Sequence, residues 1–341
     1  METIAEQHKP PRFDTTLADK YSLSEGLVFM SGTQALVRLP IQQRIRDRMA
    51  GLKTAGFISG YRGSPLGRYD MELWRVGTQL AAHDVRFQPG VNEDLAATAV
   101  WGSQYVPLLP RPKFDGVFGI WYGKGPGVDR SGDVLKHANA AGTSPLGGVI
   151  AVAGDDHGAK SSTQAHQSDQ AFVSAGMPVL YPSDVQEILD FGLHGIAMSR
   201  HAGCWVGLKL VTEVVEGSGT VLVSPDSPSI VLPEHPDGAS DVHIKRFEMP
   251  AQQEVRLYQR RLPASLAYAR ANGLNRIVNE APNARIGIVS AGKSWADTRQ
   301  AMQRLGLPSS PAGIRLLKVG MVWPLDPGIV VAFARGLDTI L

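Results

Sequence analysis

The stretch Gly116-Val117-Phe118-Gly119-Ile120 decides the fold class of this chain, because it is a short apolar run followed by a glycine-rich turn and a helix-length segment. Short apolar runs bounded in this way are typical of buried strands. Four more runs of the same kind lie at 56–59, 148–152, 178–181 and 205–211. Helix-length segments lie beside them at 32–51, 69–82, 92–105, 129–141 and 184–201. Strands that alternate with helices predict an α/β fold with a doubly wound parallel sheet.

A second alternation of strand and helix begins at Arg285. It comprises strands at 285–290 and 314–319, a helix at 294–305, and a helix that opens at Pro324 and runs to about 334. Residues 338–341 have the pattern of the start of a further strand, and a domain rarely stops inside an apolar strand. We therefore expect a second, incomplete α/β domain in a chain that is part of a longer protein.

The region between the two alternations is polar. Residues 224–250 are rich in Pro, Ser, Asp and Gly, which predicts a linker. Residues 251–279 predict a long polar helix that Pro263 kinks or splits. The expected organisation is a polar arm at 1–24, a first domain at 25–235, a linker and long helix at 236–280, and the second domain at 281–341.

The composition is that of a large globular chain without a strongly charged partner. The sequence has 341 residues, 43% of them hydrophobic, which is enough for two domains. Its 34 basic and 32 acidic residues leave a formal charge of +2, so neither nucleic acid nor an anionic membrane is expected as a partner. No apolar run has the length of a membrane span, and the amino end lacks an apolar signal core, so we expect a cytoplasmic protein.

The single cysteine, Cys204, limits the redox chemistry of this chain. One cysteine cannot form an internal disulfide, and it cannot hold an iron–sulfur cluster, which usually needs four thiolates. Cys204 lies in Gly203-Cys204-Trp205-Val206 at the start of a predicted strand, which favours a small core residue over a reactive thiol.

The turn Phe87-Gln88-Pro89-Gly90-Val91-Asn92-Glu93-Asp94 places Glu93 at the start of an apolar helix. A carboxylate at the mouth of a helix that follows a strand can point into a ligand crevice. It can also be an ordinary first-turn acid, because the helix dipole favours negative charge there. Both interpretations stay open on these residues alone.

Three more glycine-containing turns follow predicted strands. They are Gly60-Tyr61-Arg62-Gly63-Ser64-Pro65-Leu66-Gly67, Tyr122-Gly123-Lys124-Gly125-Pro126-Gly127-Val128-Asp129-Arg130 and Gly154-Asp155-Asp156-His157-Gly158-Ala159-Lys160-Ser161-Ser162. Ligands of open parallel sheets bind outside the carboxyl ends of the strands. We therefore expect these turns and Glu93 to converge on one edge of one sheet.

Each turn also has an alternative interpretation. Lys124 and Arg130 can cradle a phosphate, but the turn lacks the Gly-Lys-Ser/Thr ending of a P-loop, so a nucleotide-binding module is only an alternative. Asp155 and Asp156 can hold a metal together with His157, or they can cap the next segment. Because no second cluster offers suitable ligand spacing, we expect no metal site in this chain.

Together these segments resemble the 2-oxoacid:ferredoxin oxidoreductases, and most closely the indolepyruvate ferredoxin oxidoreductase type. The resemblance rests on Phe57-Ile58-Ser59-Gly60-Tyr61-Arg62-Gly63-Ser64-Pro65, Asn92-Glu93, Lys136-His137, the turn at 154–162, and Leu316-Leu317-Lys318-Val319-Gly320-Met321-Val322-Trp323-Pro324-Leu325. Arg62 stands where proline is common in the family, a departure seen in its large fused branch. The similarity covers roughly residues 25–341, the N-terminal part of that fused type.

The resemblance implies a thiamine-diphosphate enzyme fold, with a pyrimidine-binding domain followed by a transketolase C-terminal-like domain. Complete fused enzymes carry a diphosphate-binding domain and a further catalytic domain. They convert an aryl or branched 2-oxoacid, coenzyme A and oxidised ferredoxin to acyl-CoA, carbon dioxide and reduced ferredoxin.

This chain departs from the family at the diphosphate-and-magnesium motif, G-D-G followed by Asn, which is missing here. Thiamine diphosphate is therefore expected to be shared with a diphosphate-binding domain in the same or another chain. Mg²⁺ and a [4Fe-4S] cluster are expected only in those other parts. A homo-oligomer is also expected.

The resemblance also implies roles for individual residues. Glu93 is expected to contact the aminopyrimidine ring of the cofactor and to exchange a proton with N1′ of that ring. Gly63, Ser64 and Pro65 are expected to lie near the cofactor. The residues expected near the substrate are Arg62, Ser64, His137 and Asp156.

The alternatives to an enzyme module are a catalytically inactive pyrimidine-like domain that serves only subunit assembly and a nucleotide-binding module that uses residues 123–130. The sequence does not identify the particular 2-oxoacid.

Overall fold

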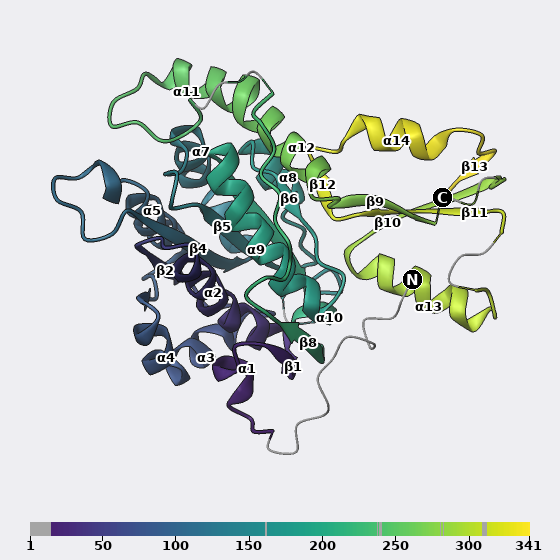
Figure 1. Ribbon diagram of the computed structural model, residues 1–341, viewed down its shortest axis with the longest axis horizontal. Coiled ribbons are helices and arrows are strands. Elements are labelled where there is room, and N and C mark those ends of the chain that lie inside the picture. Colours follow the sequence, from purple (N-terminus) through teal and green to yellow (C-terminus); the bar gives the residue numbers. More distant parts are fainter. Residues whose placement is uncertain are drawn as a thin grey trace.

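The computed structural model describes residues 15–160, 162–236, 238, 241–279, 281, 283–308 and 312–341. Residues 1–14 of the predicted polar arm and Ser161 of the predicted 154–162 turn therefore lie outside the described residues. The described chain forms a large sheet with helices on both faces and a smaller sheet beside it (Figure 1).

A seven-stranded sheet forms the centre of the larger part, with the strand order β12-β6-β7-β5-β4-β2-β3. The strands are β2 (Thr54–Gly60), β3 (Val85–Phe87), β4 (Gly116–Lys124), β5 (Val149–Asp155), β6 (Val179–Leu180), β7 (Trp205–Val211) and β12 (Met321–Trp323). All neighbouring pairs are parallel except β12 and β6. The predicted parallel sheet and its five predicted strands are confirmed. The apolar pattern does not reveal β3 and β12, which are too short to show a period.

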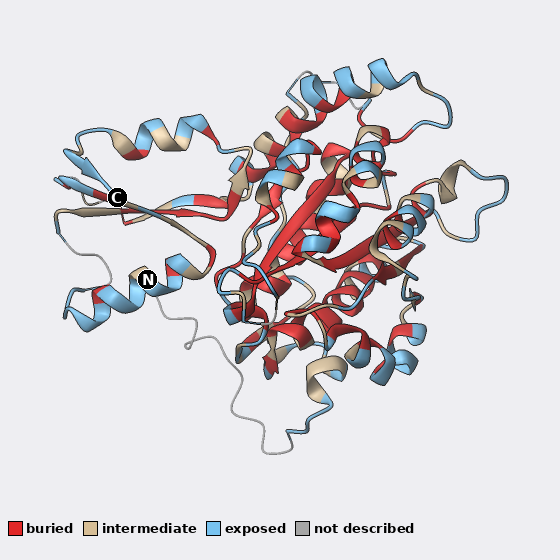
Figure 2. Cartoon of the chain, turned by 180° about the vertical axis from the view of Figure 1, so that it is seen from behind, coloured by how far each residue is buried: buried red, intermediate tan, exposed pale blue. Residues whose placement is uncertain are grey.

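β-branched side chains fill one face of this sheet. Ile58 pairs with Ile120, which pairs with Ile150 on the next strand, and all three are fully buried. They belong to the core cluster that includes residues of α2 (Gly32–Met49) and α9 (Val185–Ala202). Parallel strands form continuous apolar runs because helices cover both of their faces, and the central strands β4, β5 and β7 are almost completely buried (Figure 2).

The opposite face of the sheet packs against a second group of helices. Trp121 and Ala151 pair across β4 and β5 and lie in one core cluster with residues of α5 (Glu93–Ser103) and α7 (Gly132–Ala141). Because α5 starts beside Trp121, the packing of this face positions the first turn of that helix.

The smaller sheet has the order β13-β10-β11-β9. Its strands are β9 (Asn275–Asn279), β10 (Ile286–Ala291), β11 (Ile314–Val319) and β13 (Thr339–Ile340), and its helices are α13 (Gly292–Arg304) and α14 (Pro327–Ala334). β10 is parallel to β11 and β13, whereas β9 is antiparallel to β11. This confirms the predicted strands at 285–290 and 314–319, the helices that follow them, and the strand start at 338–341.

The predicted helix at 251–279 is wrong in its last part. The chain is helical through α11 (Pro250–Arg256), a π-helical segment at Leu257–Arg261 and α12 (Leu262–Ala271), and then enters β9. The helix ends because Gly273 takes a positive φ of 57°, and β9 finds hydrogen-bond partners on β11. Pro263 does not split the helix, because the chain stays helical from Pro250 to Ala271, with the π-helical segment Leu257–Arg261 just before the proline.

Other predicted helices are confirmed with changed limits. The segment at 69–82 forms α3 (Tyr69–Arg75) and α4 (Gly77–Ala82), and the segment at 129–141 is preceded by a separate α6 (Gly125–Arg130). An antiparallel pair of β1 (Gly26–Ser31) and β8 (Ser218–Val223) lies beside these layers. Within the described ranges, no helix combines the length and the apolar character needed to cross a membrane.

A buried ion pair joins the smaller sheet to α9, a helix that packs on the larger sheet. Lys318 on β11 donates to Glu187 on α9, and its Nζ lies 3.1 Å from Ser183 Oγ. The Ser183 amide and hydroxyl both donate to Glu187 Oε2, at 2.9 and 2.7 Å. The contact therefore ties the smaller sheet to the start of α9.

Candidate functional site

The carboxyl ends of β2, β4 and β5 lie at one edge of the large sheet, and the turns that follow them are bonded together. The Gly90 amide donates to the Gly60 carbonyl at 2.9 Å, and the Tyr61 amide donates to the Tyr122 carbonyl at 3.1 Å. These bonds hold the turn before Glu93 against the turns after β2 and β4. The predicted convergence of the Glu93 turn with these two turns is confirmed as a backbone arrangement.

Glu93 is the first residue of α5 and is half-buried. Asn92 is the N-cap residue, and its Oδ1 accepts a hydrogen bond from the Leu95 amide at 2.9 Å. Trp121 is fully buried and donates from Nε1 to the Glu93 carbonyl at 2.9 Å. The Asn92 cap and the Trp121 indole thus fix the backbone of Glu93. The Glu93 carboxylate takes no part in the cap.

Gly127 on α6 lies directly against the Glu93 side chain. A Cβ atom built on Gly127 would lie 2.6 Å from Glu93 Cγ and 2.7 Å from Oε1, too close for any other residue type without a shift. The neighbouring acid, Asp94, instead pairs with Arg130 at 3.0 Å. The two first-turn acids therefore differ, since Asp94 binds the end of α6 and Glu93 packs against its small residue.

The segment 62–65 lies at the same edge. Pro65 is buried and approaches Gly154 at the end of β5, whereas Ser64 is half-buried and Arg62 is exposed. Gly63 lies against the side chain of Lys124, which ends β4. The structure thus brings all four of these predicted residues to the sheet edge, and their cofactor and substrate roles stay predictions.

Asp156 is buried directly after β5, and its carboxylate accepts hydrogen bonds from two backbone amides of its own turn. The donors are Lys160 N at 3.1 Å and Ser162 N at 3.2 Å. Asp155 is also buried and accepts from the Ser168 amide at 2.9 Å and the Ser168 hydroxyl at 2.7 Å. The structure supports the interpretation of both aspartates as turn-stabilising residues.

His166 lies at this edge, although the sequence pattern does not single it out. Its Nε2 lies 2.8 Å from Asp129 Oδ2, and its Nδ1 lies 3.6 Å from Asp155 Oδ1. Gly125, the first residue of α6, approaches the imidazole so closely that a Cβ there would overlap the ring. The His-Gln-Ser-Asp segment at 166–169 also contains Ser168, so its polar run is the feature that could have marked it.

Lys209 completes the polar groups beside Asp155. Its Nζ lies 2.5 Å from Asp169 and 3.9 Å from Asp155, and 4.9 Å from the centre of the Tyr181 ring. Burial raises the pKa of Asp155, and hydrogen bonds from Ser168 and the charge of Lys209 oppose that rise. A lysine in the middle of an apolar strand pattern is the feature that could have indicated this cluster.

His137 does not join this group among the described residues. It lies on the exposed surface of α7, and its Nε2 is 3.6 Å from Asp133 one turn earlier. Its predicted contact with substrate therefore gains no support from the position of its side chain.

The predicted turn at 122–130 is wrong in its conformation, because β4 continues to Lys124 and α6 starts at Gly125. Residues 123–130 therefore do not form an open phosphate loop, which weakens the nucleotide-binding alternative. In the part of the chain that the structure describes, no group of three or more His, Cys, Asp or Glu side chains has the arrangement of a metal site. Cys204 is fully buried, as predicted for a core residue, and burial raises the pKa of its thiol to about 12.

Comparison with known proteins gives consistent similarities. The family described as "Indolepyruvate oxidoreductase domain" matches residues 276–341. Indolepyruvate oxidoreductase subunit IorA of Methanothermobacter thermautotrophicus is 25% identical over 330 residues, which are 95% of this chain and 48% of that protein. IorA of Pyrococcus abyssi is 23% identical over 318 residues, 92% of this chain and 44% of that protein. The chain thus spans about half the length of the curated relatives it matches.

Solved structures show the same fold at low sequence identity. The 2-oxoglutarate:ferredoxin oxidoreductase from Magnetococcus marinus superposes with a TM-score of 0.63 at 15% identity, over 92% of this chain and 57% of that chain. Transketolase from Leishmania mexicana gives a TM-score of 0.50 at 14% identity, over 93% of this chain and 38% of that chain.

The sheet order and these likenesses define an α/β protein with the doubly wound fold of the 2-oxoacid:ferredoxin oxidoreductases and transketolases. Within that class, the chain is similar to the indolepyruvate oxidoreductase subunits IorA, and its residues 276–341 match the indolepyruvate oxidoreductase domain.

Proposed function

We propose that this chain is the pyrimidine-binding part of a thiamine-diphosphate-dependent 2-oxoacid oxidoreductase. The substrate class is an aryl or branched 2-oxoacid, with indolepyruvate as the leading candidate because the relatives carry that name. The reaction is oxidative decarboxylation to acyl-CoA and carbon dioxide, with ferredoxin as the electron acceptor. The alternative is a catalytically inactive domain that serves only subunit assembly.

The position of Glu93 is the observation that carries this proposal. Its backbone is fixed by the Asn92 cap and by Trp121, and its side chain lies against a glycine at the edge where the strands end. Among the described residues, the Glu93 carboxylate has no side-chain hydrogen-bond partner and no ion pair within 4 Å. An unpaired, half-buried carboxylate at this edge is available to a ligand.

The residues present fit the pyrimidine end of thiamine diphosphate. Gly127 packs directly on the Glu93 side chain and so helps to fix the position of Oε1, the atom that would meet the ring. Bound thiamine diphosphate would supply a nucleophilic thiazolium carbon that attacks the 2-oxo group. Glu93 would share a proton between its Oε1 and N1′ of the ring. This is the role of a general acid–base residue within hydrogen-bond distance of the ring nitrogen. Gly63, Ser64 and Pro65 would line the site from the neighbouring turn.

Arg62 is the residue that we propose for the substrate carboxylate. Its guanidinium is exposed at the sheet edge, and such a group can bind a carboxylate through two parallel hydrogen bonds. Ser64 offers a hydroxyl beside it. Asp156 is committed to its own turn and His137 lies on an exposed helix face, so both take a smaller part in this proposal.

The proposal includes a shared active site. The first domain at 25–235 would supply the pyrimidine side, followed by the linker at 236–280 and the transketolase C-terminal-like domain at 281–341. A diphosphate-binding domain in the same or another chain would supply Mg²⁺, and further parts would carry the [4Fe-4S] cluster and the sites for coenzyme A and ferredoxin. A homo-oligomer and a cytoplasmic location belong to the same proposal.

The decisive experiment compares Glu93→Gln with Asp94→Asn in the complete enzyme. Both changes remove one negative charge from the first turn of α5, but only Glu93 is free to meet the cofactor. With thiamine diphosphate, a 2-oxoacid, coenzyme A and a viologen acceptor, we expect Glu93→Gln to lower kcat about 100-fold or more. Asp94→Asn is expected to stay within about threefold of the parent.

Equal activities of the two variants would overturn the role of Glu93. A complete protein that binds its partner domain but shows no 2-oxoacid oxidation with any aryl or branched substrate would favour the assembly-only alternative.

A further inference from the structure

A cavity of about 600 Å³ lies at the opposite edge of the large sheet, away from Glu93. It is formed near the amino ends of β2 and β5, by the last turns of α2 and α9 and the segment around Pro225. Its wall is mostly apolar, with Met49, Leu52, Leu146, Ala197, Ile230 and Leu232. Cavities of this size are typical of small-molecule sites.

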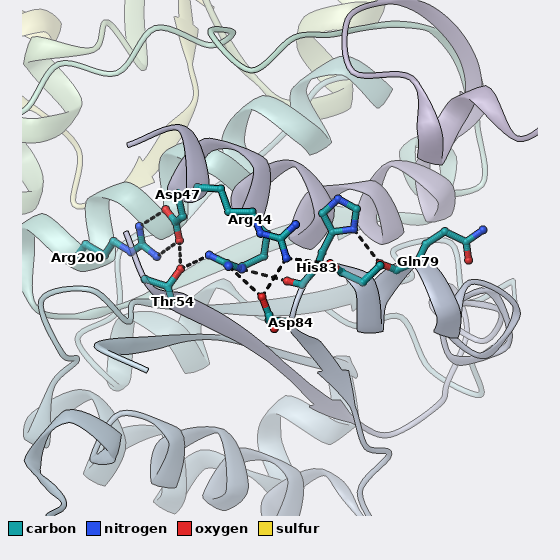
Figure 3. A network of polar contacts seen from close by, with 9 residues as sticks. Arg44, Asp47, Thr54, Gln79, His83, Asp84 and Arg200 are labelled. Atoms are coloured by element: carbon teal, nitrogen blue, oxygen red, sulfur yellow. Dashed lines mark hydrogen bonds and ion pairs between the residues drawn. The ribbon is translucent and has the colours of Figure 1, made fainter. Parts of the chain in front are cut away.

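One carboxylate of the wall, Asp47, is saturated by its own neighbours (Figure 3). Arg200 donates to both of its oxygens, at 2.7 and 2.8 Å. Thr54 donates to Oδ2 at 2.5 Å, and Gln43 donates to Oδ1 at 2.7 Å. Asp47 therefore has no capacity left for a cation, and Arg200 has no free charge for an anion.

The other arginines at the end of α2 are also paired. Arg44 lies 3.2 Å and Arg48 lies 2.9 Å from Asp84 Oδ2. Arg44 also donates to Thr54 Oγ1 at 2.6 Å (Figure 3). This leaves Arg46 as the exception among three arginines on two turns of one helix.

Arg46 lines the cavity, its side chain has no hydrogen bond or ion pair among the described residues, and its Nη1 is buried without a partner. Burial lowers the pKa of this guanidinium, and Tyr268 and the carboxylates of Asp226, Asp47 and Asp190 oppose that shift. His201 lines the same cavity, stacks on His235 at 4.4 Å between ring centres, and has a buried Nε2 without a partner. Two polar side chains of one apolar cavity thus lack partners.

We propose that this cavity binds a small amphipathic carboxylate, whose charged group pairs with Arg46 and whose aryl or branched aliphatic body packs on the apolar wall. Arg46 suits a carboxylate because a guanidinium presents a planar fork of donors. The site is distinct from the one proposed at Glu93 and does not depend on that function.

Asp226 places a negative charge at the cavity. It lines the cavity, and its exposed side chain forms no ion pair with Arg46 among the described residues. A bound carboxylate would be repelled by Asp226, so this residue weakens binding without abolishing it. Replacing it by asparagine is therefore expected to increase affinity.

The experiment is isothermal titration calorimetry of the whole protein with phenylacetate, and with phenylacetamide as the uncharged analogue. We expect phenylacetate to saturate one site and phenylacetamide to bind about tenfold more weakly or worse. Arg46→Met is expected to weaken phenylacetate binding about tenfold or more. Arg48→Met, which removes a paired arginine of the same helix, is expected to leave binding within about twofold.

The proposal is overturned if phenylacetate does not saturate a site, if phenylacetamide binds as tightly, or if Arg46→Met weakens binding less than about threefold. If Arg46→Met does not fold, Asp226→Asn decides. A several-fold gain in phenylacetate affinity supports the site, and an unchanged or weaker affinity contradicts it.

Discussion

Gly127 and Glu93 are in contact across two short turns, with only 2.7 Å between a Cβ atom built on Gly127 and Glu93 Oε1. The relationship joins the first turn of α6 to the first turn of α5. It makes the position of the Glu93 carboxylate depend on a residue without a side chain, 34 positions later in the sequence.

Gly127→Ala is expected to displace the Glu93 carboxylate. The added methyl group overpacks the contact, which typically costs about 1–3 kcal/mol of folding free energy, and it moves the group that we propose as the acid–base residue. We expect a loss of 2-oxoacid oxidation in the complete enzyme with only a modest fall in the thermal midpoint. Gly132→Ala is the matched control, because no atom lies within 4 Å of a Cβ built there. Equal effects of the two changes would contradict this account.

Glu187→Gln is expected to destabilise the protein by about 3–5 kcal/mol, because it leaves Lys318 as a buried charge without its partner. The double variant Glu187→Gln, Lys318→Met is expected to recover part of this loss. Urea unfolding of the two single variants and the double variant measures the coupling free energy. Lys293→Met, which removes an exposed ion pair with Asp297, is the control and is expected to cost less than about 1 kcal/mol. A coupling free energy near zero would contradict a stabilising contact between β11 and α9.

Arg261→Met is expected to cost about 3–5 kcal/mol of unfolding free energy. Arg261 is fully buried and donates to the carbonyls of Val242, Asn139, Ala140 and Ala141, at 2.6 to 3.0 Å. Its loss leaves these buried acceptors unpaired at the end of α7. The adjacent Arg260 provides the control, because its side chain is exposed and Arg260→Met is expected to change stability by less than about 0.5 kcal/mol. Similar costs for both variants in chemical denaturation would contradict this role.

Asp190→Asn is expected to gain stability relative to the parent as pH rises from 4 to 7. Burial raises the pKa of Asp190 to about 7, and a hydrogen bond from Gln186 opposes the rise. The protonated carboxyl is favoured by folding, so its contribution is complete below the unfolded pKa near 3.9 and is lost as pH rises through about 7. Asparagine does not titrate, so the difference in unfolding free energy grows with pH, by up to a few kcal/mol. A difference that stays constant over this range would contradict the raised pKa.

The sequence allows five of the seven strands of the large sheet to be predicted, because a parallel strand covered on both faces is mostly apolar. Ile58, Ile120 and Ile150 belong to such runs, and the structure pairs them across neighbouring strands. The elements that the sequence does not reveal are short or depend on distant partners. β9 is polar at three of its five positions and directly follows a helical segment, and its hydrogen bonds to β11 make it a strand.

The candidate site divides in the same way. The turn before α5 and its Asn92 cap are local, so Glu93 at a helix start is predictable from its neighbours. The approach of Gly127 to Glu93 and of His166 to Gly125 is not predictable, since each joins residues on different elements. The same holds for Arg44, Arg46 and Arg48 of α2. The sequence does not distinguish them, and only the structure shows that Arg44 and Arg48 form ion pairs whereas the Arg46 side chain forms none among the described residues.

The sequence by itself thus determined the α/β class, the order of its strands and helices, and the resemblance that indicates a family, since these depend on local period and composition. Only the tertiary structure decided which side chains meet, which charges are paired and which are left without partners. The physical reason is that the hydrophobic pattern of a segment is local to that segment. The contacts at a site instead arise from packing between segments that are far apart in the chain.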